Sequence, residues 1–305
     1  MAINKNSTGY TFAFSIIMVV LVGASLATTS LSLKEKQKSN ASEKKMMDIL
    51  GAVGIESNRS NAKEKFQEIV IERISFDYNG EHSIVKSDDI EDADDPFYID
   101  VRKNYRSNKP TDASWTDAKD LRFPIYVCKV KDPDTNDSLI LNVIPVVGSG
   151  LWGPIWGYVA LKDDNQSIYG AKFDHKTETP GLGAEINGAS FSNSFKQNKV
   201  LATKTEMVSD TLDTLTLEDE KKTVIDSLKT LNYDWLFNAF SLENYNGKVT
   251  DKGHAFFTIA KGGTNTKESD QVDGITGGTI TSKGVEEMIN RNLAIYSRYF
   301  DKEAK

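Results

Sequence analysis

The stretch from Asp273 to Ser282, with the sequence DGITGGTITS, combines residue types that suit the binding of a phosphate group. Its three glycines permit positive φ angles and let a ligand approach the backbone closely, while its three threonines supply hydroxyl groups. Free amides and hydroxyls in a glycine-rich turn favour an anionic ligand. The pattern is neither a P-loop nor a dinucleotide fingerprint, because Gly-Lys-Ser/Thr and three spaced glycines are both missing.

A helix is predicted directly after this stretch. Apolar residues recur with the spacing of one helical face, at positions 285, 288, 289, 293, 296, 299 and 300. Thr281 or Ser282 is the expected N-cap. A phosphate bound here would face unpaired amides and the positive end of the helix dipole. The structural alternative is a glycine-rich connector between a strand and a helix.

Composition limits the partners and cofactors of this 305-residue chain. A net charge of -7 and a pI near 5.2 argue against a nucleic-acid partner. Cys128 is the only cysteine, so one chain builds no disulfide, iron–sulfur cluster or thiolate zinc site. The histidines at 82, 175 and 254 lie far apart, and no metal site is expected. A redox role therefore requires an organic cofactor.

The N-terminal region predicts one membrane span. Residues 7–33 carry no charged side chain, and we place a transmembrane helix at 10–33 after a tail at 1–9. A cleaved signal peptide is the alternative. A second, amphipathic helix is expected over 34–55, ended by Gly54. Lysines just after the span favour a cytoplasmic domain by the positive-inside count, whereas the resemblance described below implies an external one.

The remainder predicts an α+β fold, an antiparallel sheet with flanking helices. A helix over 63–75 runs into a strand at 69–76, and the acidic run at 88–95 is expected to be a solvated loop. Four further strands are expected at 123–130, 139–147, 155–161 and 167–173.

Two more motifs lie at the ends of these strands. The segment 148–157, GSGLWGPIWG, places Trp152 among glycines, either to plug the sheet or to wall a planar ring. The segment 175–186, HKTETPGLGAEI, makes a tight turn, with a helix expected from Ala184 to Phe195. Glu178 is read as a local hydrogen-bond partner or, as the alternative, a proton acceptor.

These motifs, taken in order, resemble the covalent FMN-binding domain family. DGITGGTITS is similar to the family signature Asp-x-x-Ser/Thr-Gly-Ala-Thr-x-Thr-Ser, with Gly278 where the family usually has alanine, and HKTETPGLG resembles its second signature. Within that family, the motifs resemble those of the C subunits of sodium-translocating NADH:quinone reductases. This resemblance implies one FMN per chain, attached to Thr279 through a phosphoester. It also implies supporting roles for Asp273, Thr276, Gly277, Gly278, Thr281, Ser282, Thr179, Leu182, Gly183 and Trp152.

The resemblance further implies an electron-transfer subunit of a membrane translocase that oxidises NADH and reduces ubiquinone. NADH oxidation is expected on partner subunits, and a flavin transferase is expected to attach the FMN. The implied location is the bacterial inner membrane, single-pass, with the main domain on the periplasmic side. Alternatives are the equivalent subunit of a ferredoxin:NAD-linked complex, a membrane-anchored module that binds a free phosphate ligand, and a plain structural subunit.

The expected domain organisation follows from these segments. A juxtamembrane helix and an N-terminal α+β part occupy 34–120, and the FMN-binding domain occupies 121–305. Residues 201–252 exceed what the family needs and are expected to form an insertion with a helix capped by Thr216.

Overall fold

The computed structural model describes residues 7–77, 82–86, 90, 94–102, 122–133, 135–165, 167–196, 257–265 and 271–303. The chain divides into two compact units, one up to Met46 and the other from Met47 onward. The predicted insertion at 201–252, with its helix capped by Thr216, lies outside the described residues.

The first unit consists of helix α1 (Thr8–Ala52), whose last residues belong to the second unit. Its apolar side chains from Phe12 to Leu33 are exposed on all sides. Within the described part of the chain, α1 is the one helix long and apolar enough to cross a membrane, with a mean hydropathy of 2.2 in its most apolar window. Length and composition alone also fit a signal sequence near an N-terminus.

Helix α1 runs without a break through the two segments that the sequence separates at residue 33. It ends where predicted, because Gly54 adopts φ 78° and the N–H of Ile55 donates to the carbonyl of Leu50. A glycine in the left-handed region just after the last turn is a common helix stop. The helix predicted to reach Gly54 is therefore confirmed.

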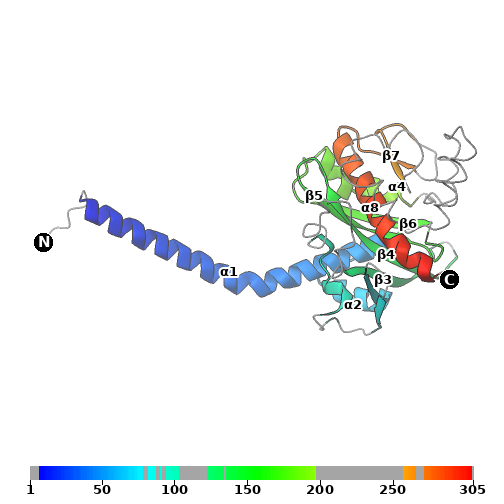
Figure 1. Cartoon of the computed structure of the whole chain (residues 1–305), viewed down its shortest axis with the longest axis horizontal. Coiled ribbons are helices and arrows are strands. Elements are labelled where there is room, and N and C mark those ends of the chain that lie inside the picture. Colours follow the sequence, from blue (N-terminus) through cyan, green and yellow to red (C-terminus); the bar gives the residue numbers. More distant parts are fainter. Residues whose placement is uncertain are drawn as a thin grey trace, which may run out of the picture. The chain divides into compact units, whose positions relative to one another are not determined.

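The second unit is built on an antiparallel sheet of six strands in the order β2-β1-β3-β4-β5-β6, as Figure 1 shows for its central strands. The strands are β1 (Val70–Asp77), β2 (His82–Val85), β3 (Arg122–Lys131), β4 (Ser138–Ser149), β5 (Pro154–Leu161) and β6 (Ile168–His175). Neighbours in sequence are mostly neighbours in the sheet, as in a meander. The predicted α+β architecture is confirmed.

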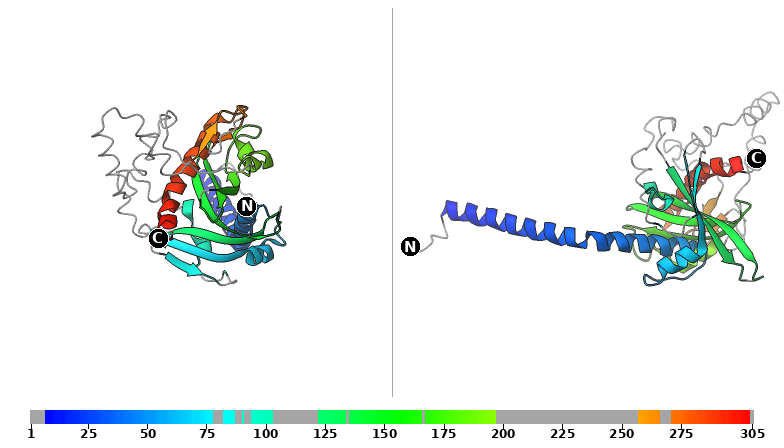
Figure 2. Two further views of the ribbon diagram at one scale, coloured as in Figure 1. Left: turned by 90° about the vertical axis from the view of Figure 1, so that its right-hand side faces the viewer. Right: turned by 90° about the horizontal axis from the view of Figure 1, so that it is seen from below.

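One face of the sheet packs against helix α8 (Thr279–Glu303), which makes most of its contacts with β4 (Figures 1 and 2). Side chains that alternate along the strands point to this face, so Ile125 and Val127 join the same buried cluster as Ile289 and Tyr296 of the helix. The helical spacing predicted from Val285 onward is thus the spacing of a buried stripe.

The opposite face is covered by shorter elements. Helix α2 (Ala62–Ile69) brings Phe66 against Tyr126 of β3, and the 3-10 helix η1 (Pro96–Tyr98) brings Phe97 against Phe66. The end of α1 lies on β6, because a Cβ on Gly170 would come within 2.6 Å of the Ala52 carbonyl oxygen. Both faces of the sheet are therefore buried.

A buried ion pair lies on this second face. Arg73 of β1 donates to the carboxylate of Asp95 with its Nε and Nη2 at 2.9 and 2.7 Å, and both side chains are almost fully buried. Asp95 also accepts from the N–H of Phe97 and so caps η1. The acidic run at 88–95 was expected to be a solvated loop, and that expectation is wrong for Asp95, whose carboxylate neutralises a buried guanidinium.

Three helix predictions require correction. The helix expected over 63–75 ends at Ile69, where strand β1 begins. The helix expected from Ala184 to Phe195 is two short helices, η3 (Gly183–Asn187) and α4 (Ala189–Ser194), because Gly188 is extended with ψ 150°. Helix α8 begins at Thr279, so the expected N-cap at Thr281 or Ser282 is wrong.

Candidate functional site

The stretch from Asp273 to Ser282 joins strand β8 (Gln271–Asp273) to helix α8. Gly277 adopts φ 79°, and the N–H of Gly278 closes the turn on the carbonyl of Ile275. The hydroxyl of Ser282 reaches back from the helix and accepts from the N–H of Ile275 at 2.9 Å. The stretch is therefore a fixed turn, held from both sides.

The hydroxyl groups of the turn fall into two classes. Those of Thr281 and Ser282 are buried and hydrogen-bonded, the first to Glu178 and the second to the Ile275 N–H. Thr276 and Thr279 are exposed. Only an exposed hydroxyl is accessible to a second macromolecule, so two of the four residues remain as candidates for modification.

The first turn of α8 presents backbone donors beside Thr279. Among the residues that the structure describes, none accepts a hydrogen bond from the backbone N–H of Thr279 or of Ile280. Such amides and the helix dipole favour an anion at the start of a 25-residue helix. Thr279 therefore combines an exposed hydroxyl with a local environment that stabilises a phosphate.

Asp273 supports the turn from its other side. Its Oδ2 accepts from the N–H of Asn265 at 2.7 Å, in the turn that follows strand β7 (Thr258–Ala260). The N–H of Gly274 donates to the carbonyl of Ala260, and a Cβ on Gly262 would come within 2.5 Å of the Thr276 nitrogen. Asp273 thus helps to pack two glycine-containing turns against each other.

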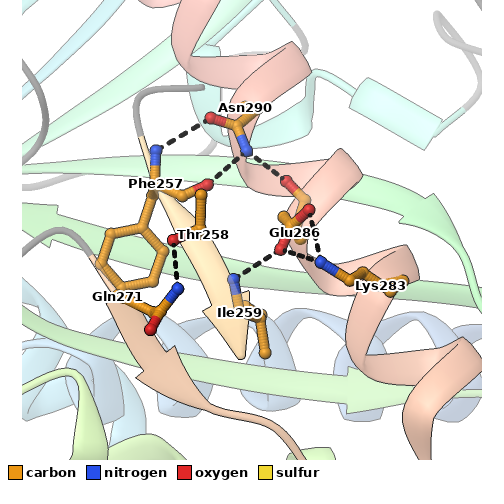
Figure 3. A network of polar contacts seen from close by, with 7 residues as sticks. All are labelled: Phe257, Thr258, Ile259, Gln271, Lys283, Glu286 and Asn290. Carbon is orange, nitrogen blue, oxygen red and sulfur yellow. Dashed lines mark hydrogen bonds and ion pairs between the residues drawn. The ribbon is translucent and has the colours of Figure 1, made fainter. Parts of the chain in front are cut away.

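Helix α8 also fixes strand β7, as Figure 3 shows. The side chain of Asn290 accepts from the N–H of Phe257 at 3.0 Å and donates to its carbonyl at 2.6 Å. The carboxylate of Glu286 accepts from the N–H of Ile259 and pairs with Lys283 at 2.8 Å. The helix side chains replace a neighbouring strand along one edge of β7, while β8 pairs with the other edge in parallel.

This two-stranded sheet was not predicted from the sequence. Three-residue strands are too short to show an alternating pattern, and β7 ends directly before a loop that contains Gly262 and Gly263. The available signal was the pair of polar residues Glu286 and Asn290, four positions apart on the otherwise apolar side of the helix. Such buried polar groups require partners.

The second predicted motif lies directly against the turn. Gly181 adopts φ 77°, and the carbonyl of Thr179 accepts from the N–H groups of Leu182 and Ala184. Leu182 is 43% exposed, and its Cδ2 would lie 2.7 Å from a Cβ on Gly277. Gly183 is buried beside Thr281. The side chain of Thr179 is exposed on the outside of the motif.

The Trp152 segment joins the other two through backbone contacts. The Trp152 N–H donates to Oε1 of Glu178 at 2.8 Å, and its carbonyl accepts from the hydroxyl of Thr177 at 2.9 Å. Its indole side chain is 66% exposed, so Trp152 does not plug the end of the sheet. The three motifs, separate in the chain, converge on one site.

Exposed apolar side chains occur in all three motifs. They are Leu151, Trp152, Leu182 and Ile280, the last of which is 60% exposed directly after Thr279. Sequence reasoning named Trp152 and Leu182 but missed Leu151 and Ile280. A planar ring system held near Thr279 has apolar groups to contact, in accord with the usual lining of cofactor sites.

A cavity of about 820 Å³ adjoins the turn, within the size range of small-molecule sites. Asp273 and Thr276 form part of its wall, and Glu185, Asn193 and Asn265 contribute polar groups from the neighbouring segments. The site therefore has a polar side as well as an apolar one, which matches the two chemical halves of a flavin nucleotide.

The described residues do not suit a redox-active thiol or a bound metal ion. Burial raises the pKa of the Cys128 thiol, so it does not act as a redox thiolate near neutral pH. In the described ranges, no three His, Cys, Asp or Glu side chains are grouped to hold a metal. The donors that converge here are amides and hydroxyls, which suit a phosphate.

Comparison with known proteins agrees with this geometry. Residues 150–294, which are 145 of the 305 residues, match the model of the FMN-binding domain family, so the resemblance read from the three motifs is confirmed. The matched segment contains the Trp152 loop, the second motif and the turn before α8.

Several relatives found by sequence carry the same name. The C subunit of the Na(+)-translocating NADH-quinone reductase from Chlamydia trachomatis is 32% identical over 54% of this chain and 41% of its own length. The protein of that name from Vibrio vulnificus strain YJ016 is 25% identical over 92% of this chain and 88% of its own. This chain thus spans less than half of the chlamydial relative but most of the Vibrio one.

Solved structures are similar over most of the chain. The crystal structure of the C subunit of the Na(+)-translocating NADH-quinone reductase from Parabacteroides distasonis aligns with a TM-score of 0.57 and 28% identity, and the alignment covers 88% of this chain and 96% of that one. NqrC of Shewanella oneidensis aligns with a TM-score of 0.55 at 17% identity, over 87% of this chain and 100% of that one, which supports the fold alone.

Proposed function

We propose that this chain, whose residues 150–294 match the FMN-binding domain family, is the electron-transfer subunit of a sodium-translocating NADH:quinone oxidoreductase and carries one covalent FMN on Thr279. The observation that carries the proposal is the position of Thr279. Its hydroxyl is exposed at the first residue of α8, beside backbone amides without partners in the described residues. The relatives' shared name supports the choice of complex.

The residues present fit the phosphate of FMN. The turn that Gly277 allows would let the phosphate approach the helix amides, and Thr279 would hold it through an ester. When bound, the flavin supplies the redox chemistry, since no redox-active thiol or grouped metal ligands occur among the described residues. Asp273, Thr281 and Ser282 keep the turn in shape, and Leu182, Gly183, Thr179 and Trp152 form its surroundings.

Covalent attachment changes what the protein must do. Because an ester retains the cofactor, the surrounding residues need not supply binding affinity and instead orient the flavin. NADH oxidation and ubiquinone reduction would then occur on partner subunits, and a flavin transferase would act on the exposed Thr279. Helix α1 would anchor the chain in the bacterial inner membrane as a single span, with sodium transport carried out by the assembled complex.

Membrane orientation has its own test. The proposed periplasmic position of the second unit conflicts with Lys34, Lys36 and Lys38 just after the span, which a positive-inside count places in the cytoplasm. A periplasm-dependent reporter fused after Lys305 is expected to be active. Activity of a cytoplasm-dependent reporter at the same position would reject the proposed side.

The decisive test of the cofactor is in-gel flavin fluorescence of the full chain coexpressed with a flavin transferase. A fluorescent band after denaturation is expected, because an ester survives unfolding. Yellow protein that loses its flavin on denaturation would support a module that binds a free phosphate ligand. Colourless protein under every condition would support a plain structural role. Co-purification with a ferredoxin-linked complex instead of a quinone reductase would assign the chain to the related assembly.

A further inference from the structure

Glu178 connects the three motifs of the site through one buried side chain. It is only 4% exposed. Its Oε1 accepts from the N–H of Trp152 at 2.8 Å, and its Oε2 accepts from the hydroxyl of Thr281 at 2.6 Å. Its own N–H donates to Nδ1 of His175 at 3.3 Å. Residues that lie 26 and 103 positions from Glu178 in the chain are therefore held on the same carboxylate.

Two glycines, Gly150 and Gly183, leave room for this carboxylate because they have no side chain. A Cβ on Gly150 would lie 2.6 Å from Oε1, and a Cβ on Gly183 would lie 2.5 Å from Oε2 and 2.3 Å from the Thr281 hydroxyl oxygen. Any larger residue at either position would force the carboxylate or its partners to move. The glycines thus have a specific reason to occur in their motifs, apart from turn formation.

The hydrogen bond from the Thr281 hydroxyl to Glu178 fixes how the first turn of α8 is rotated about the helix axis. Successive residues of an α-helix are rotated by about 100°, so Thr279 and Thr281 point in directions about 200° apart. With the Thr281 hydroxyl directed into the interior toward Glu178, Thr279 must face outward. The observed exposure of Thr279 and burial of Thr281 agree with this relationship.

We propose that Glu178 is a positioning residue for flavin attachment, since its carboxylate holds Thr281 and thereby presents the Thr279 hydroxyl to the transferase. This inference rests on the proposed function. In the attachment, the Thr279 oxygen bonds to phosphorus while the phosphoanhydride bond of a flavin dinucleotide donor breaks. The nucleoside monophosphate leaves with the electron pair of that bond, and the threonine proton passes to solvent. Glu178 contacts no reacting atom and acts only through Thr281.

The test measures the rate at which purified full-length protein, made without flavin, is labelled by flavin transferase and flavin dinucleotide. Thr281→Val removes the hydroxyl at nearly constant shape, and we expect labelling to slow about tenfold or more. Thr281→Ser restores the hydroxyl and is expected to label at nearly the wild-type rate. A purely structural loss would not distinguish valine from serine at equal melting temperatures.

Glu178→Gln tests the other partner. It keeps an oxygen for the Trp152 N–H but places an amide N–H2 opposite Thr281, whose hydroxyl oxygen then accepts instead of its O–H donating, so labelling is expected to slow less than in Thr281→Val. In the double variant with Thr281→Val, the slowing should not exceed that of Thr281→Val alone, because valine at position 281 offers no hydroxyl through which the side chain at position 178 can act. Glu72→Gln is the matched control. That carboxylate lies on β1 and pairs with Lys86, away from the turn, and its loss should leave labelling unchanged.

The outcomes separate this inference from the proposed function. A wild-type chain that acquires no flavin would overturn both. A labelled wild type with Thr281→Val and Thr281→Ser labelled at equal rates would overturn the positioning role alone, and these two variants decide the question even if Glu178→Gln fails to fold. Multiplicative slowing in the double variant would likewise contradict a role of Glu178 through Thr281.

Discussion

Gly183 lies so close to Thr281 that a Cβ at position 183 would come within 2.3 Å of the threonine hydroxyl oxygen. The same Cβ would lie 2.5 Å from Oε2 of Glu178. The hydrogen bond between the Thr281 hydroxyl and the Glu178 carboxylate holds both side chains in place. The second motif and the first turn of α8 therefore fit together only with glycine at this position.

Gly183→Ala is expected to lower the free energy of unfolding by about 1–3 kcal/mol, the usual cost of overpacking a filled site. Thermal melting of the purified chain measures the effect. Gly181→Ala is the control, since that glycine has no neighbour within 4 Å and its substitution is opposed only by its φ of 77°. Equal melting temperatures for Gly183→Ala and wild type would show that the clash is relieved by rearrangement.

Gly278→Ala restores the alanine that the resemblance leads one to expect. A Cβ there would meet the Ile275 side chain at 3.0 Å and the Gly183 nitrogen at 3.3 Å, contacts that a shift of a few tenths of an ångström relieves. Flavin attachment should persist, with stability within about 1 kcal/mol of wild type. Gly277→Ala, with φ 79° and Leu182 Cδ2 at 2.7 Å, should reduce both attachment and stability. Loss of attachment in Gly278→Ala would contradict this account of the turn.

Replacing only one residue of the buried ion pair between Arg73 and Asp95 is expected to lower the free energy of unfolding strongly. Arg73→Met leaves a buried carboxylate with fewer donors, so stability should fall by about 3–5 kcal/mol. Lys86→Met removes the exposed partner of Glu72 and should cost about 1 kcal/mol or less. Thermal melts of the two variants provide the comparison. Similar losses in both would mean that the burial of the Arg73 pair contributes little.

Alkaline pH is expected to destabilise the second unit. Burial raises the pKa of Cys128, Tyr126, Tyr158 and Tyr296 above the usual values of 9.0 for the thiol and 10.0 for the phenols. The folded state thus holds these protons more tightly than the unfolded chain. Its stability is full below pH 9 and falls as the pH rises further. Melting temperatures measured from pH 7 to 11 should decline above pH 9, with a shallower onset in Cys128→Ala. A flat profile would contradict the burial of these groups.

Much of the fold could be predicted because its elements carry strong local patterns. The apolar runs of β3 to β6 and the helical spacing after Val285 both reflect burial, and Gly54 ended α1 as expected. The helix predicted from Ala184 failed because Gly188 prefers an extended conformation there, a choice that depends on packing rather than on periodicity. The N-cap was misplaced because Ser282 and Thr281 bond to Ile275 and to Glu178 instead of capping the helix.

The candidate site was predictable in part. Three motifs could be recognised in the chain, but their convergence on the carboxylate of Glu178 depends on contacts between residues 26 and 103 positions apart. The same holds for the hydrogen bond from the backbone N–H of Phe257 to the side chain of Asn290, 33 positions away. In such a long-range pair, each polar residue stands alone in its own part of the sequence, with nothing nearby to indicate its partner. The two partners can therefore be identified only from the structure.

The central claim is tested most directly by mass spectrometry of the peptide containing Thr279, taken from full-length chain coexpressed with its flavin transferase. The turn has two exposed hydroxyls, so Thr279→Ala and Thr276→Ala are compared with wild type. We predict one FMN adduct per chain in wild type and in Thr276→Ala, and none in Thr279→Ala. An adduct that persists in Thr279→Ala, or that disappears only in Thr276→Ala, would contradict the assignment of the flavin to Thr279.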